Sequence, residues 1–258
     1  MRIGTFLLAF WAALFAGSAV FAADAPPAKA GRILEGPVVR VGNGSAHTVV
    51  TTDAAGAPTT IGIVMTAGTL DGLPKPAGHM SDFQYELPMP KGVSTTVNHV
   101  VIDWEAAGHP PPGVYDVPHF DFHFYMISKP ERMKIAFASD AASGDPSQQP
   151  PADSLPPGYI VPPGTAVPHM GVHAIDPAAP EFHGQPFKTT FIYGYYNKTL
   201  AFYEPMASLA FLQSKPSFAA TVARPKTYPK PGLYPSSYSI EFDSGRHQYE
   251  IVLRDLKP

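Results

Sequence analysis

Hydrophobic and polar residues alternate with a period of two over many short segments of this chain, and this spacing is typical of β-strands with one buried face. The segments are rich in β-branched and aromatic residues, and Gly, Asn and Asp turn residues separate them. The best candidate for a short helix is residues 207–213. We predict strands at residues 38–41, 47–52, 59–65, 97–104, 119–127, 189–196, 199–203, 238–242 and 247–253.

Proline and glycine content supports a strand-and-loop protein. The 258 residues include 31 prolines and 22 glycines, which interrupt the chain too often for long helices, whereas the 12% aromatic content argues against disorder. Residues 136–168 form a proline-rich segment that is too long for a simple connection, so we expect a mobile loop that partly covers a functional site. We predict an all-β fold, barrel-like or sandwich, with a cupin-like barrel among the alternatives.

The N-terminus has the order of a secretory signal peptide. A short positive start precedes an apolar run at residues 3–15 and small residues at 17–23, with cleavage expected after Ala22. The alternative is an uncleaved anchor, because an apolar helix of this length could just span a bilayer of about 30 Å. The predicted organisation is a signal peptide at 1–22, a flexible segment at 23–35 and one β-rich domain at 36–258. We expect a periplasmic or extracellular protein without stable membrane insertion after cleavage.

Charge and cysteine content exclude several classes of function. The chain has 18 basic and 21 acidic residues, a net charge of −3 and no run of either sign, which argues against a nucleic-acid partner. It contains no cysteine, so thiolate metal sites and disulfides are excluded, and packing or a bound ion must stabilise the fold. The Gly-x-Ser-x-Gly elbow and the phosphate-binding loop are also missing.

The densest group of reactive side chains lies in the segment HFDFHFY at residues 119–125. Its phenylalanines share one face of a strand, while His119, Asp121, His123 and Tyr125 share the other. A helical interpretation must be weighed, because His119 and His123 have the four-residue spacing of zinc-binding helices. The preceding Pro118 and the strict alternation favour the strand, in which the two histidine Cα atoms lie about 13 Å apart. Asp121 therefore pairs with either histidine more easily than the histidines pair with each other.

A second histidine block repeats the pattern of the first. The phrase Val-Pro-His-x-x-x-His occurs at residues 117–123 and again at 167–173, and Glu204 follows an apolar strand. Imidazoles with carboxylates suit zinc, iron, manganese or copper. The predicted ligands of one divalent ion are His119, Asp121, His123, His173 and Glu204, and the predicted neighbours that orient ligands or carry protons are Tyr125, His169 and Asp176. We interpret His47, His79, His99, His109 and His247 as ordinary packed or surface residues.

These blocks resemble a bacterial family of unknown function. The shared phrases are Asp103-Trp104, GHPPPGVYDVPHFDFHFY at 108–125, MGVH at 170–173, FIYGYY at 191–196 and FYEPM at 202–206. An aromatic residue often follows the MGxH phrase in that family, whereas this chain has Ala174. The resemblance implies no activity. The arrangement is also similar in style to cupins, although the cupin motif spacing is not met, so that comparison is one of analogy.

Three functions fit these observations. The first is a metalloenzyme, the second a protein that binds metal without turnover, and the third a structural, oligomeric envelope or stress protein whose histidines are packed. A small-molecule ligand and a homo-oligomer are compatible with each. An open coordination position would favour the enzyme, and a closed shell would favour the binding protein.

The exported protein is expected to begin at Ala23 or Asp24, because the small-residue segment ends there. N-terminal sequencing of the exported material measures this directly. Recovery of exported protein with Met1 intact would contradict the prediction.

Overall fold

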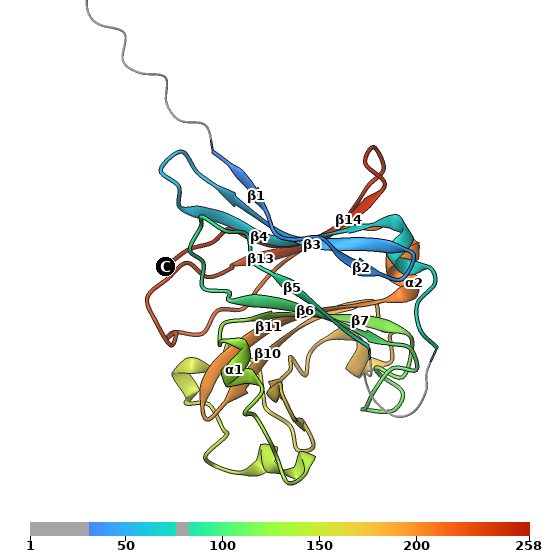
Figure 1. The fold of residues 1–258 in the computed structure, drawn as a ribbon. Helices are drawn as coiled ribbons and strands as arrows, with labels where there is room; N and C mark the ends of the chain where they lie inside the picture. The colour runs from blue at the N-terminus through green and yellow to red at the C-terminus, as the bar shows by residue number, and fades with distance from the viewer. Residues whose placement is uncertain (1–30, 76–82) are drawn as a thin grey trace, which may run out of the picture.

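Two seven-stranded antiparallel sheets lie face to face in the computed structural model, which describes residues 31–75 and 83–258 (Figure 1). The predicted signal peptide, most of the predicted flexible segment and His79 lie outside the described residues. The predicted all-β fold is confirmed. The architecture is a sandwich of two antiparallel sheets that includes a curled half-barrel.

The first sheet, sheet A, contains the N-terminal and C-terminal strands. In spatial order its strands are β1 (Ile33–Glu35), β3 (Gly44–Thr52), β4 (Pro58–Thr66), β14 (Gln248–Arg254), β13 (Ser237–Asp243) and β12 (Ser217–Thr221), with β2 (Val39–Val41) also paired to β3.

The second sheet, sheet B, is built from the middle of the chain. Its strands are β5 (Gln84–Pro88), β6 (His99–Glu105), β7 (His119–Tyr125), β11 (Thr199–Ser208), β10 (Thr189–Tyr196), β9 (Gly171–Ala174) and β8 (Ala166–Val167). The helices are α1 (Lys129–Arg132), α2 (Leu209–Gln213) and the 3-10 turns η1 (Ala67–Leu70), η2 (Asp140–Gly144), η3 (Ala152–Ser154) and η4 (Pro180–His183). Among the described residues, none of these helices has the length and apolar character needed to cross a bilayer.

The predicted strands are all present, and several predicted boundaries need correction. Ile33–Glu35 pairs with β3 as strand β1, whereas we expected it in a flexible segment. Strand β11 continues to Ser208, so the predicted helix begins at Leu209, where the Ser208 hydroxyl accepts a hydrogen bond from the Phe211 amide. Strands β1, β5, β8, β9 and β12 were not predicted, because they are short or lack clear alternation.

The proline-rich segment 136–168 packs against the edge of sheet B. The Tyr195 hydroxyl donates to the Ser154 carbonyl over 2.7 Å, and Gln148 donates to the Asn197 side chain over 2.8 Å. Near the end of the segment the carbonyl of Thr165 lies 2.8 Å from Nδ1 of His173, so the segment does contact the histidine cluster. Its mobility stays a prediction.

Strand β7 holds the two sheets together through one of its faces. Phe120, Phe122 and Phe124 are fully buried in the core cluster that also contains Ile63 and Ile251 of sheet A. Burial of a side chain of this size stabilises the fold by about 1.5–3 kcal/mol. Because alternate residues point to opposite faces, the remaining side chains of β7 point away from sheet A.

That outer face of sheet B is covered by chain segments rather than by another sheet. Figure 1 shows the green and yellow segments between β7 and β10 on the side of sheet B that faces away from sheet A. The ladder between β7 and β11 is interrupted between the pairs Tyr203–Phe124 and Met206–Asp121. Pro205, which has no amide hydrogen, lies in this gap beside Glu204. The structure therefore buries a polar face under loops.

Substitution Gly194→Ala should destabilise the fold, because a Cβ at residue 194 would overlap the ring of Phe202 on the neighbouring strand. We expect a loss of about 1–3 kcal/mol in the free energy of unfolding, measured by urea denaturation. The control is Gly144→Ala, since an added Cβ there has no neighbour within 4 Å. Equal stability of the two variants would contradict this account of Gly194.

Candidate metal centre

Two groups of histidine and carboxylate side chains meet on the outer face of sheet B. We call His123, His173 and Glu204 the Glu204 group, and His109, His119 and Asp121 the Asp121 group. In each group the three potential ligand atoms lie within 4.8 Å of one another. The predicted ligands are therefore divided between the two groups. His109, which is not a predicted ligand, completes the Asp121 group.

The Glu204 group is assembled from three strands. Nε2 of His123, on β7, lies 3.6 Å from one carboxylate oxygen of Glu204, and Nε2 of His173, on β9, lies 3.7 Å from the other. The ring of Phe202 packs edge-on against both imidazoles, with centroid distances of 4.9 and 5.3 Å. The Tyr125 ring stacks on His123 at 5.5 Å. Aromatic side chains thus fix the orientation of both histidines.

The Asp121 group combines β7 with the loop that precedes it. Nε2 of His119 lies 3.2 Å from one oxygen of Asp121, and Nε2 of His109 lies 3.5 Å from the other. The loop folds back on itself because the His109 amide donates to the Tyr115 carbonyl over 3.1 Å. The side chains of His119 and Asp121 are only 0% and 4% exposed, whereas that of His109 is 22% exposed.

The other ring nitrogen of each histidine faces an oxygen that can only accept hydrogen bonds. Nδ1 of His109, His119 and His173 lies 2.7–2.8 Å from the carbonyls of Pro110, Val117 and Thr165, respectively. A carbonyl cannot donate, so Nδ1 carries the hydrogen, and Nε2 of the neutral ring presents a lone pair. Nδ1 of His123 lies 2.8 Å from the Asp103 carboxylate, close to it but not aligned as a hydrogen bond.

In both groups, Nε2 of each imidazole, which has a lone pair when the ring is neutral, therefore points at a carboxylate oxygen. His119 Nε2, Asp121 Oδ1, His123 Nε2 and Glu204 Oε2 are buried and have no hydrogen-bond partner. Two acceptors face each other stably only with a cation between them, either a proton or a metal ion. Ligand atoms about 2.0–2.1 Å from a tetrahedral zinc ion lie about 3.3 Å apart. The observed separations of 3.2–3.7 Å agree better with this spacing than with a charged hydrogen bond of about 2.7–2.9 Å.

Burial and neighbouring charges shift the pKa values in both groups. Burial would lower the pKa of His109 and of His123, but Asp121 raises the first to about 9, and Glu204 with Asp103 raises the second to about 9. Burial, reinforced by the charge of Asp121, raises the pKa of Glu204 to about 8. Although burial opposes it, the positive charges of His119 and His109 keep the pKa of Asp121 well below its usual value. Burial lowers the pKa of His173 to about 4.

Three interpretations from the sequence need correction. His109 is a member of the Asp121 group, not an ordinary surface residue, because the loop returns it to β7. The His169 side chain is exposed, and only its carbonyl turns inward, where it accepts from the Tyr125 hydroxyl over 3.3 Å. Asp176 accepts a hydrogen bond from the Ala178 amide and stabilises a turn, so it does not orient a ligand.

Besides His109, the sequence interpretation missed Asp103. It is fully buried on β6, directly opposite Asp121 in the strand register, and its carboxylate faces His123. An acidic residue among valines and isoleucines at a buried strand position was the available signal, because such a residue is seldom buried without a partner.

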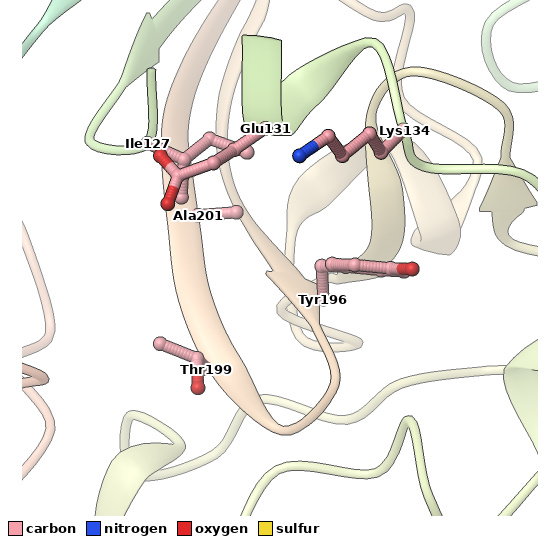
Figure 2. A pocket seen from close by; sticks show the side chains of 6 residues that line it. All are labelled: Ile127, Glu131, Lys134, Tyr196, Thr199 and Ala201. Carbon is pink, nitrogen blue, oxygen red and sulfur yellow. The ribbon is translucent and has the colours of Figure 1, made fainter. Parts of the chain in front are cut away.

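A separate surface pocket lies beside α1 and the start of β11, as Figure 2 shows. It contains none of the residues of the two groups. Its acidic residue, Glu131, accepts hydrogen bonds from the amide and hydroxyl of Ser128 and so caps α1. The pocket lining is Ile127, Glu131, Lys134, Tyr196, Thr199 and Ala201. We assign no chemistry to it.

Comparison with known proteins gives one partial match. A family model described as TTHB210-like, hypothetical protein TTHB210, matches residues 53–104. No curated protein and no solved structure matches the chain. The matched segment includes Asp103 and ends before His109, the first histidine of either group. The match therefore covers none of the residues of the two groups.

The metal-free protein should lose stability as the pH rises from about 6.5 to about 9. His109 and His123, with pKa near 9 when folded and about 6.5 when unfolded, stabilise the fold below pH 6.5 and cease to do so as they deprotonate. Glu204, with its raised pKa of about 8, also stabilises the folded state less as the pH rises through this range. The lowered pKa of His173 affects stability only below about pH 6.5.

Thermal melts across this pH range, with a chelator and with added zinc, measure the effect. Zinc should reduce the loss, because the ion replaces the protons and binds more tightly as they leave. A melting temperature of the chelated protein that stays constant or rises across the window would contradict the assignment.

Proposed function

We propose that this chain is an exported protein that binds a divalent transition metal ion through His123, His173 and Glu204. The observation that carries the proposal is the pair of imidazole lone pairs that converge on a buried carboxylate, with separations of 3.6 and 3.7 Å. Nδ1 of His173 lies 2.8 Å from the Thr165 carbonyl and Nδ1 of His123 lies 2.8 Å from the Asp103 carboxylate. Such acceptor oxygens behind the ring are typical of metal-ligating imidazoles.

The donor set favours zinc, iron, manganese or copper. Two imidazoles with one carboxylate occur in catalytic zinc sites and in non-haem iron sites. The chain has no cysteine, so sites that depend on soft thiolate ligands do not apply. Asp103 acts in this proposal as the carboxylate that orients His123 and increases its basicity.

The ligand count favours a metalloenzyme. Structural zinc sites are usually closed by four protein ligands, whereas catalytic sites keep three and leave a position for water or substrate. The Glu204 group has three, and the side chain of His173 is 13% exposed, so this ligand borders solvent. When bound, such an ion polarises a carbonyl or lowers the pKa of a coordinated water. The protein would hold the ion, orient His123 through Asp103 and exclude bulk water.

Deep burial supports a second candidate function. The side chains of His123 and Glu204 are only 1% and 3% exposed, which favours slow release of a bound ion. A protein that stores a metal, or one in which the ion stabilises an oligomeric envelope component, would show the same burial. Turnover distinguishes the two candidates, since only the enzyme needs an exchangeable fourth position.

Export and family membership belong to the same proposal. The predicted signal peptide supports a periplasmic or extracellular location. We also propose membership of the bacterial family that shares the histidine-rich blocks. In its favour, blocks distant in sequence supply His109, His119, His123, His173 and Glu204 to one face of one sheet.

Substitution Glu204→Gln should remove the ion from the Glu204 group while preserving the shape of the side chain. Loss of an orienting residue typically weakens metal binding about 10–100-fold. We expect a weakening of about this size for Asp103→Asn and of at least this size for Glu204→Gln, because Glu204 is a direct ligand. Zinc titration calorimetry and elemental analysis of the purified protein measure both. The control is His247→Ala, because His247 is exposed and remote from both groups. Full metal content in the Glu204 variant would refute this centre.

A further inference from the structure

We infer that His109, His119 and Asp121 form a second, separate site for a divalent transition metal ion, so that each chain binds two ions. This goes beyond the proposed centre, which uses neither these residues nor the loop that carries His109. The inference depends on the geometry of the Asp121 group alone.

Unpartnered buried atoms point to a ligand at this second site. Nε2 of His119 and Oδ1 of Asp121 are buried, 3.2 Å apart and without hydrogen-bond partners. Nε2 of His109 approaches the other oxygen of the same carboxylate at 3.5 Å. A cation between the two imidazoles and the carboxylate would satisfy all of these atoms together.

The main chain holds both imidazoles in the tautomer that metal binding needs. The carbonyls of Val117 and Pro110 each lie 2.7 Å from Nδ1 of His119 and His109, so Nδ1 carries the hydrogen and Nε2 is free to coordinate. Both carbonyls belong to the loop that precedes β7. Local chain geometry therefore prepares the site.

Aromatic residues enclose the Asp121 group and add no competing ligand. The Phe187 ring packs edge-on against His119 at 5.5 Å, and the Tyr115 ring lies 5.6 Å from His109. The Tyr115 hydroxyl donates to the buried carboxylate of Glu181 over 3.2 Å, so it is occupied away from Asp121. These apolar rings surround the buried His119 and Asp121, where attraction to a cation is stronger than in water.

The ligand atoms form two separate clusters, each with its atoms within 4.8 Å of one another. Asp121 and His123 are two residues apart on β7, which places their Cα atoms about 6.6 Å apart. Ions in a shared two-metal site are usually about 3.5–4 Å apart with bridging ligands. Each group here has its own carboxylate, Asp121 or Glu204, so each ion can bind while the other site is empty.

The experiment counts ions per chain, with zinc as the probe, by titration calorimetry and elemental analysis of the full exported protein. We expect two ions for the wild type, one for Asp121→Asn, one for Glu204→Gln and none for the double variant. His109→Ala provides a second variant, because His109 lies on a loop and is partly exposed. It should weaken zinc binding at the Asp121 group by at least tenfold and leave binding at the Glu204 group unchanged. His183→Ala, a change of another exposed histidine, at the end of η4, is the matched control.

The outcomes separate this inference from the proposed function. One ion in the wild type that survives Asp121→Asn overturns the second site and leaves the Glu204 centre standing. One ion that both single variants remove also overturns it, because the two groups would then form one site. Absence of zinc binding in the wild type refutes the second site and the proposed function together.

Discussion

The outer face of sheet B buries carboxylates that need positive charge close by. Asp103, Asp121 and Glu204 are removed from water, and an unpaired buried ion costs several kcal/mol. Four histidines surround these carboxylates, and each has one ring nitrogen directed at them or at an acceptor behind it. The charge balance requires protons on some of these groups or metal ions between them. The rest of the site is arranged around this requirement.

The fold meets this requirement by giving the two faces of one strand different environments. The phenylalanine face of β7 packs against sheet A, and the ionisable face turns to the loops. The interruption of the ladder at Pro205 leaves space for Glu204 beside His123. On β10, Gly194 leaves space for the Phe202 ring, which packs against both His123 and His173. Local departures from regular pairing therefore shape the binding site.

Much of this arrangement follows from period-two patterning. The alternation at residues 119–125 was enough to predict the strand, its apolar face and the proximity of His119 and Asp121. It could not predict the division into two groups, because that depends on the register between β7 and β11 and on the return of the His109 loop. His169 was misplaced because its backbone adopts a left-handed conformation, with φ of 62°, which the repeated Val-Pro-His pattern does not reveal.

The ionisable cluster lies outside the sandwich core, and this separates two kinds of evolutionary change. Substitutions in the loops over sheet B can alter which molecule reaches the ligands without disturbing the packing between the sheets. Substitutions between the sheets act on folding and leave the polar face intact as long as the strand register is kept. A scaffold of this kind can change its specificity with little effect on folding. Strand β7 must be preserved in both kinds of change, because its two faces contribute to the core and to the site.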